Sequence, residues 1–235
     1  MIRERSVIAI IPARGGSKGI PRKNLYQIGG TSLLERAINL GKQGRLVDRV
    51  LVSTDDPEMY AIAQKHNCAT PQPRPASLAT DSARTVDVIR NLVEEKVFSE
   101  RDCLLLLQPT SPLRQVSQLN ALCEMIQEQW EKVDAVVSVN EIDGPHPYKA
   151  QVVKDGYLQS LIGLDSSVPR QSLPKTFIPN GAFYLIKVST LLQENTFVPK
   201  KSIPFVMGAL ESINLDGPLD LLLLEAVLAK GLVHG

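Results

Sequence analysis

The chain has 235 residues, enough for one large domain or for one domain with an inserted sub-domain. Its 26 basic and 25 acidic residues give a net charge of +1, which argues against a general nucleic-acid-binding protein, because such proteins need a surplus of lysine and arginine. The longest apolar run, residues 221–229, is broken by Glu225 and is too short to cross a bilayer, so we expect no membrane partner.

Short β-branched runs alternate with amphipathic stretches in the first half of the chain. Strands are predicted at residues 7–11, 47–53, 103–107 and 135–139, and helices at 32–42, 57–66, 83–98 and 117–130. Residues 103–107 are apolar throughout, as expected of a strand buried on both faces. This alternation predicts an α/β fold with a doubly wound, mostly parallel sheet.

The pattern changes after about residue 140. A hairpin is predicted at 148–161, turning at 154–156, and a polar stretch with prolines covers 163–179. Because this segment has little core of its own, we interpret it as an arm, at about 140–179, inserted into a single domain that spans 1–235. Further strands are predicted at 182–188 and 202–207, and a last helix at 218–230.

A basic, glycine-rich loop at residues 13–24 is the most informative feature of the chain. It contains the glycines Gly15, Gly16 and Gly19 and the cations Arg14, Lys18, Arg22 and Lys23. The loop matches neither a Walker A motif nor a dinucleotide fingerprint. Its position between a buried strand and the helix predicted at 32–42 favours phosphate binding, since backbone N–H groups and a helix N-terminus attract anions. Four cations suit a triphosphate better than one phosphate.

Polar residues follow the predicted strands at 53–56, 108–112 and 140–143. Ligands of open α/β sheets bind at the carboxyl ends of the strands, so these segments and the basic loop are expected to form one polar rim. The segment 140–143 is better explained as a simple turn.

The cysteines Cys68, Cys103 and Cys123 are few, odd in number and without metal-ligand spacing. They are expected to be buried free thiols in a reducing compartment. The start of the chain shows no signal peptide, so a cytoplasmic location is expected.

Six motifs occur in order along nearly the whole chain. They are Ile11-Pro-Ala-Arg-Gly-Gly-Ser-Lys-Gly-Ile-Pro-Arg-Lys-Asn24, Val52-Ser-Thr-Asp55, Arg74-Pro-Ala-Ser-Leu-Ala-Thr-Asp81, Leu107-Gln-Pro-Thr-Ser-Pro-Leu-Arg114, Pro169-Arg-Gln171 and Pro179-Asn-Gly-Ala-Phe-Tyr184. Together they resemble the acylneuraminate cytidylyltransferase family, the CMP–sialic acid synthetases and their relatives. Relatives that activate the eight-carbon sugar KDO usually carry a different loop, so residues 17–21 favour nine-carbon acid sugars.

The resemblance implies a nucleotide-diphospho-sugar transferase-like fold and a reaction in which CTP and a 2-keto acid sugar give a CMP-sugar and pyrophosphate. It implies that Arg14 and Lys23 hold the triphosphate and the leaving pyrophosphate, and that Asp216 and Asn214 hold Mg²⁺. The full nucleotide-binding set is Arg14, Gly15, Gly16, Ser17, Lys23, Asn24, Arg74 and Thr85. A second role for Arg74, as a partner of Asp81 in its own loop, is equally open.

The resemblance also implies a sugar pocket and a homodimer. The sugar-binding residues would be Gln108, Lys149, Arg170, Tyr184 and Phe197. Arg170 suits a bidentate pair with the sugar carboxylate, and by resemblance it would reach the active site of the other subunit. The inserted arm would then be a dimerisation arm.

Two positions depart from the family pattern. Asn214 stands where relatives have the first of two metal-binding aspartates, and a carboxamide brings no charge. Asp220 is a possible substitute, although a role in the first turn of the last helix suits it better. Ile178 stands where several relatives carry a basic residue. Two alternatives therefore stay open, a nucleotidylyltransferase of the same fold for another acid sugar such as KDO, and a non-catalytic nucleotide-binding relative.

Overall fold

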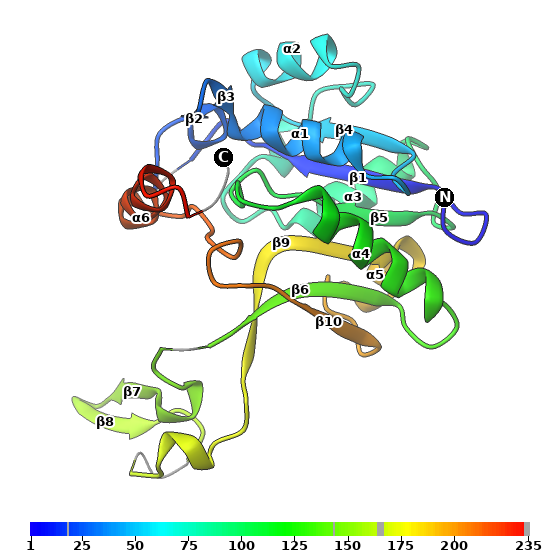
Figure 1. Cartoon of the computed structure of the whole chain (residues 1–235). Coiled ribbons are helices and arrows are strands. Elements are labelled where there is room, and N and C mark those ends of the chain that lie inside the picture. Colours follow the sequence, from blue (N-terminus) through cyan, green and yellow to red (C-terminus); the bar gives the residue numbers. More distant parts are fainter. Residues whose placement is uncertain (18, 143, 164–166, 233–235) are drawn as a thin grey trace.

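The computed structural model describes residues 1–17, 19–142, 144–163 and 167–232. Its core is a six-stranded sheet in the order β10-β6-β9-β5-β1-β4 (Figure 1). The strands are β1 (Val7–Pro12), β4 (Arg49–Ser53), β5 (Cys103–Leu106), β6 (Ala135–Glu141), β9 (Phe177–Lys187) and β10 (Ser202–Val206). All neighbours pair in parallel except β9, which runs antiparallel to β5 and β6. The predicted α/β fold with a mostly parallel sheet is confirmed.

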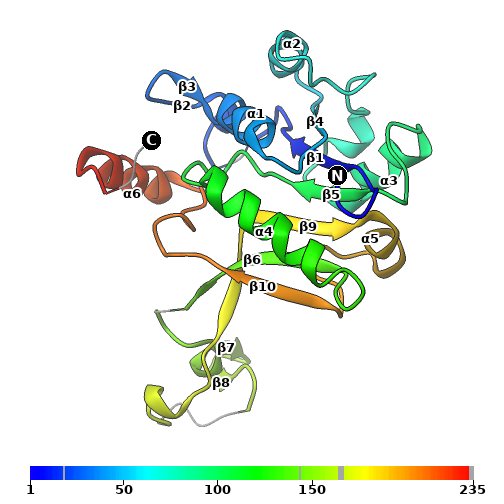
Figure 2. The same cartoon turned by 45° about the vertical axis from the view of Figure 1, so that its right-hand side comes forward.

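Helices cover both faces of the sheet because the strand residues alternate in direction (Figure 2). The helices are α1 (Leu33–Gln43), α2 (Pro57–Lys65), α3 (Thr85–Glu94), α4 (Val116–Glu128), α5 (Val188–Glu194) and α6 (Pro218–Ala229). Val7, Ala9 and Ile11 pack with α1, α2 and α4 in one buried cluster. Ile8 and Ile10 pack with α3 and α5 in another. The alternating apolar residues of β1 therefore account for the two-sided core.

The antiparallel strand β9 is longer than its sequence predicted. A strand was expected at 182–188, but β9 begins at Phe177, which pairs with Glu141 of β6. The register shifts between Val137 and Val139, and Gly181 of β9 adopts φ +78°, which side-chain-bearing residues rarely adopt. Because of this irregularity, β9 can pair both with the sheet and with the far end of β6, which the local sequence did not indicate.

The predicted hairpin forms and stands apart from the sheet (Figure 1). Its strands are β7 (Gln151–Lys154) and β8 (Tyr157–Ser160), and the turn at Asp155–Gly156 lies where the sequence placed it. Val153, Tyr157 and Leu158 are each 73% exposed. The hairpin therefore adds little to the core described above.

The strand β1, the basic loop and the helix α1 follow one another in the expected order, but the loop does not lead directly into α1. A 3-10 turn, η1 (Lys23–Leu25), and a small hairpin of β2 (Gln27–Ile28) and β3 (Thr31–Ser32) lie between them. Cys68, Cys103 and Cys123 are buried and free, as expected. No helix among the described residues has the length and apolar character that crossing a membrane requires.

Candidate functional site

A cavity of about 530 Å³ opens at the carboxyl ends of β1 and β5. Its walls come from the basic loop, the segment 74–88, the residues after β5 and the segment before α6. The site residues predicted from the sequence that line this cavity are Arg14, Ser17, Lys23, Asn24, Arg74, Thr85, Gln108, Asn214 and Asp216. The fold thus brings together nine of the predicted site residues from four separate parts of the chain. We call this space the loop cavity.

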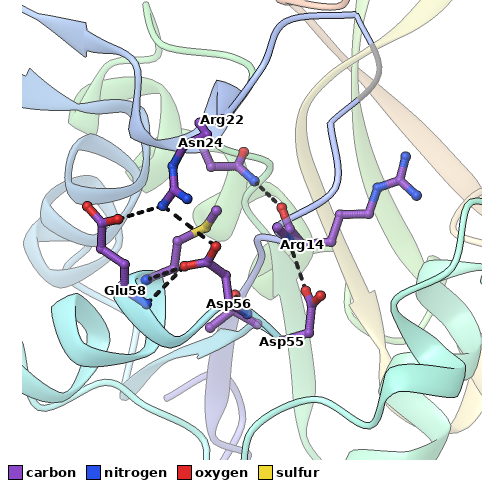
Figure 3. A network of polar contacts seen from close by, with 9 residues as sticks. Arg14, Arg22, Asn24, Asp55, Asp56 and Glu58 are labelled. Atoms are coloured by element: carbon purple, nitrogen blue, oxygen red, sulfur yellow. Dashed lines mark hydrogen bonds and ion pairs between the residues drawn. The ribbon is translucent and has the colours of Figure 1, made fainter.

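Backbone and side-chain contacts hold the basic loop in place (Figure 3). The buried Asn24 donates its amide to the carbonyl of Arg14 at 3.1 Å, and the Gly15 N–H donates to the Asp55 carboxylate at 2.9 Å. The Gly15 amide, predicted to face a phosphate, is therefore directed at Asp55. A Cβ at Gly19 would lie 1.9 Å from the carbonyl oxygen of Asp216, so only glycine allows this close approach. The loop is built to lie against the segment before α6.

The described cations of the loop each have a carboxylate partner. Arg14 lies 2.7 Å from Asp81, and Lys23 lies 3.2 Å from Asp216. Lys23 also donates to the carbonyl of Leu215 at 2.6 Å. Lys18 lies outside the described residues. In the described part of the loop, positive charge is thus balanced within the protein itself.

Arg22 contributes to α2 rather than to the cavity (Figure 3). Its guanidinium lies 2.6 Å from Glu58 and 3.6 Å from Asp56, the residue that caps α2. Its backbone has φ 52°, in the left-handed region. The expectation that the described cations of the loop all serve one anion is therefore wrong for Arg22.

The helix N-terminus at the loop cavity belongs to α3, not to α1. Ser32 and Glu35 form a capping box that satisfies the first N–H groups of α1. Thr85, the first residue of α3, and Val88 in its first turn line the loop cavity instead. The predicted contribution of the helix at 32–42 is thus not found, because its first N–H groups are capped by its own side chains and no described residue of α1 lines the loop cavity.

Arg74 is held by the end of β4. Its Nε donates to the Ser53 hydroxyl at 3.1 Å and its Nη2 to the Ser53 carbonyl at 2.6 Å. Burial lowers the pKa of Arg74 to about 10, partly offset by the nearby carboxylate of Asp55. Among the described contacts, Asp81 pairs with Arg14 and not with Arg74. Arg74 therefore combines a place in the wall of the loop cavity with a bracing role on β4.

Gln108, Asn214 and Ser111 converge on Gly181. A Cβ added there would lie 2.8 Å from Gln108 Oε1 and 3.7 Å from both Asn214 Oδ1 and Ser111 Oγ. The last two atoms are buried and accept or donate no hydrogen bond within the described residues. Buried polar atoms without partners are rare in folded proteins. Of these residues, Gln108 and Asn214 line the loop cavity, where the Gln108 carboxamide can accept hydrogen bonds from a polar ligand or donate to it.

Asp216 and Asn214 form one wall of the loop cavity beside Lys23. The Asn214 amide donates to Asp216 Oδ2 at 2.6 Å, and the Asp216 side chain is 72% exposed. Asp220 accepts hydrogen bonds from the N–H groups of Asp216 and Gly217, at 2.8 and 2.7 Å. Asp220 thus serves the first turn of α6, the role that suited it better in the sequence.

Three predicted sugar-binding residues with described side chains, Lys149, Tyr184 and Phe197, do not line the loop cavity. Tyr184 packs edge-on against Phe197, with ring centroids 5.7 Å apart, in the cluster beneath α3 and α5. Lys149 lies on the arm, next to β7. Arg170 also lies on the arm, and its side chain is outside the described part of the structure. Of the predicted sugar residues whose side chains are described, Gln108 alone lines this cavity.

The expected polar rim is only partly formed. Of the segment 53–56, Asp55 holds the basic loop and Asp56 caps α2. Asn140 and Glu141 belong to β6, so they form no turn, and Asp143 lies outside the described residues. The segment 108–112 reaches the cavity, through Gln108, Pro109 and Thr110.

A family model for cytidylyltransferases matches residues 8–162, more than half of the chain. This match covers the basic loop, the Arg74 segment and Gln108. The chain belongs to the cytidylyltransferase family.

Within this family, the chain is similar to curated proteins that act on acid sugars. An N-acylneuraminate cytidylyltransferase of Streptococcus agalactiae serotype V is 30% identical over 212 residues, which are 89% of this chain and 50% of that protein. The CMP-N,N'-diacetyllegionaminic acid synthase of Legionella pneumophila is 27% identical over 234 residues, 94% of this chain and 96% of that protein. The chain thus spans about half the length of the streptococcal relative.

A solved structure of a cytidylyl-transferring enzyme supports the fold of this cytidylyltransferase. The CMP:2-keto-3-deoxy-manno-octonic acid synthetase, complexed with CTP, superimposes with a TM-score of 0.67 at 17% identity, covering 96% of this chain and 99% of that one. At this identity the likeness shows the fold alone.

Sequence reasoning missed the carboxylates that organise the site of this cytidylyltransferase. Asp81 and Asp55 lie inside motifs that carried the resemblance, yet their roles as partners of Arg14 and Gly15 depend on contacts between distant segments. The closeness of Gly19 to Asp216 likewise has no local signal. A glycine in a basic loop indicates phosphate binding and close packing equally well.

Proposed function

We propose that this cytidylyltransferase transfers CMP from CTP to a nine-carbon 2-keto acid sugar and releases pyrophosphate. The proposal is supported by the family and by relatives whose names specify acylneuraminate and diacetyllegionaminic acid. One observation of the structure carries it most. Arg14, Lys23 and Gln108 line the same cavity, which supports a site where cations for a polyphosphate and a hydrogen-bonding side chain for a sugar share one space.

In the proposed reaction the anomeric hydroxyl of the sugar attacks the α-phosphorus, and the bond to the β-phosphate oxygen breaks. Negative charge grows on the departing pyrophosphate, so fixed cations stabilise the transition state more than the ground state. Lys23, with a side chain only 15% exposed, is held in place by Leu215 and Asp216 before substrate arrives. Arg14 would exchange Asp81 for the triphosphate. Such exchange requires little rearrangement, because the arginine is already at the cavity wall.

We also propose that Mg²⁺ takes part, bound mainly through the nucleotide. Mg²⁺ prefers oxygen ligands and often binds through one or two carboxylates plus substrate phosphates. Asp216 offers an exposed carboxylate that fits such an ion, and Asn214, whose amide N–H now donates to Asp216, would join it after turning its amide oxygen to the same side. No group of three His, Cys, Asp or Glu side chains in the described residues could hold a metal without substrate. The ion would neutralise phosphate charge.

We further propose that the protein is a homodimer in the cytoplasm. The arm would form the contact between the subunits, and its residues Arg170 and Lys149 would reach the active site of the other subunit. The exposed apolar side chains of β7 and β8 support this use of the arm. Sedimentation of the purified protein gives the oligomeric state directly. Mixing an Arg14→Ala subunit with an Arg170→Ala subunit tests the shared site, because one composite site would then be intact. A proven heterodimer without activity would assign Arg170 to its own subunit.

The decisive experiment is Mg²⁺-dependent release of pyrophosphate from CTP across a panel of acid sugars. The panel includes sialic, legionaminic, pseudaminic and deaminated nine-carbon acids and KDO. Release with a nine-carbon acid and with CTP in preference to other nucleotides is the expected result. Release with KDO alone would assign the alternative eight-carbon activity, and CTP binding without turnover on any sugar would leave a non-catalytic nucleotide-binding relative.

A further inference from the structure

A second cavity, of about 420 Å³, lies behind the segment that carries Gln108. One wall is α1 with the residue before its cap, and the other is the segment 109–116 between β5 and α4. Pro109 lines both this second cavity and the loop cavity, so the two spaces are neighbours. Nothing in the proposed reaction uses the second cavity.

Two arginines line the second cavity, and their charges are not compensated. Arg36 projects from α1, and Arg114 from the end of the 109–116 segment. Neither forms an ion pair with any described carboxylate, and no aspartate or glutamate is among the described residues that line the cavity. This is the reverse of the loop cavity, where Arg14 and Lys23 both have carboxylate partners.

Arg114 is the more deeply buried of the two, with only 8% of the residue exposed. Its Nη1 donates to the Ala182 carbonyl at 2.8 Å, and its guanidinium lies 5.7 Å from the Phe183 ring centroid. These contacts give it a structural role, but its buried Nε makes no hydrogen bond within the described residues. Burial alone lowers the pKa of Arg114 to about 9. A buried charge without a partner is costly, so an anion there would be strongly favoured.

Arg36 and Ser111 add further unused polar atoms to the same walls. The Nε of the half-buried Arg36 and the Oγ of Ser111 are also buried and without hydrogen bonds among the described residues. Burial lowers the pKa of Arg36, and no nearby carboxylate opposes the shift. The outer guanidinium nitrogens of the two arginines make one hydrogen bond among the described residues, from Arg114 Nη1 to Ala182, so the remaining Nη groups are free to donate to a tetrahedral oxyanion in the cavity.

We infer that the second cavity is a binding site for a phosphate group, held by the guanidinium groups of Arg36 and Arg114. The charge favours phosphate over a carboxylate, because a phosphate monoester dianion matches two arginines and a carboxylate matches one. The group can be free inorganic phosphate or part of a small phosphomonoester. The site is separate from nucleotide binding, because its donors come from α1 and the 109–116 segment and not from the basic loop.

Calorimetric titration of the whole protein with inorganic phosphate and with glycerol 3-phosphate, at saturating CTP, tests this site. CTP occupies the loop cavity, so any remaining phosphate binding reports the second cavity. We expect one phosphate group per chain in the wild-type protein and binding weakened about tenfold or more in Arg36→Gln, the usual cost of losing a charged hydrogen-bonding partner. Binding of both probes identifies the phosphate group alone as the ligand, and binding of glycerol 3-phosphate alone identifies a phosphomonoester.

Arg45→Gln is the matched control. Arg45 follows α1 and pairs on the surface with Glu124 at 2.7 Å, so the variant loses the same charge without changing the cavity. Arg114→Lys keeps the charge but loses the fork, and we expect it to bind phosphate more weakly than wild type. If that variant does not fold, Arg36→Gln decides.

Three results would overturn the inference. They are no phosphate binding to wild type at millimolar concentration, equal binding by wild type and Arg36→Gln, and acetate binding as tightly as phosphate. A chain that fails to bind CTP would count against the proposed function, and the comparison of Arg36→Gln with Arg45→Gln is then made without the nucleotide.

Discussion

The loop cavity is lined by Arg14, Lys23 and Arg74 and the second cavity by Arg36 and Arg114, and the two cavities differ in how these cations are paired. In the loop cavity, Arg14 and Lys23 are balanced by Asp81 and Asp216. In the second cavity, Arg36 and Arg114 have no carboxylate partner among the described residues. Paired cations remain stable without ligand and can be released to a substrate by exchange, whereas unpaired buried cations cost free energy until an anion arrives. A site whose cations exchange a carboxylate for a substrate suits a ligand that binds and leaves in each catalytic cycle. A site with unpaired buried cations suits an anion that stays bound.

Lys23→Ala is expected to have the largest effect, because it removes the cation held in place for the departing pyrophosphate. We expect kcat/KM for CTP-dependent pyrophosphate release to fall by roughly two to three powers of ten, the usual loss for a preorganised charge stabiliser. Lys42→Ala is the control, since Lys42 is exposed and donates to the His66 carbonyl outside both cavities. Near-wild-type turnover in a folded Lys23→Ala protein would remove Lys23 from the mechanism.

Gly19→Ala tests whether the loop cavity depends on the close approach of its loop to Asp216. A Cβ there would lie 1.9 Å from the Asp216 carbonyl, so the loop must move. We expect the free energy of unfolding in urea to fall by about 1–3 kcal/mol, the usual cost of overpacking, together with weaker CTP binding. Gly16→Ala is the matched control, because no atom lies within 4 Å of the added Cβ. Equal behaviour of the two variants would show that the loop adapts freely.

Asn214→Asp should add a second carboxylate beside Asp216 and tighten a metal bound with the nucleotide. We expect the Mg²⁺ concentration for half-maximal rate to fall about tenfold or less, because charge strengthens a hard-cation site. Asn67→Asp, on the surface outside the loop cavity, makes the same change in charge without touching the site. An unchanged Mg²⁺ requirement, with Asp220→Ala raising it, would place the metal at Asp220 instead.

Asp81→Asn is expected to have the smallest effect of these variants, since it removes only the carboxylate charge that pairs with Arg14. Exposed ion pairs contribute about 0–1 kcal/mol, so CTP should bind up to roughly fivefold more tightly in calorimetry. Asp87→Asn, which weakens the surface pair with Arg84 at 3.1 Å, is expected to leave CTP affinity unchanged. Weaker CTP binding by Asp81→Asn alone would mean that Asp81 orders the loop rather than competing with the nucleotide.

The sequence by itself determined the elements and the chemistry of the basic loop. Period-two and helical patterns located the strands of the parallel sheet, and motif order indicated the family before any contact was known. These signals are local, because side-chain direction follows from backbone geometry. The same reasoning failed at the start of β9, because residues 177–179 fell within the polar stretch expected at 163–179 and gain their strand pairing from β6.

Only the tertiary structure decided which charges are paired. Arg22 pairs with Glu58, Arg14 pairs with Asp81, and Arg36 and Arg114 line one cavity. In the sequence all of these are simply charged residues in polar segments. Their roles depend on which distant segments the sheet brings together and on how much water the packing removes around each charge. The spacing of nearby residues in the sequence specifies neither of these.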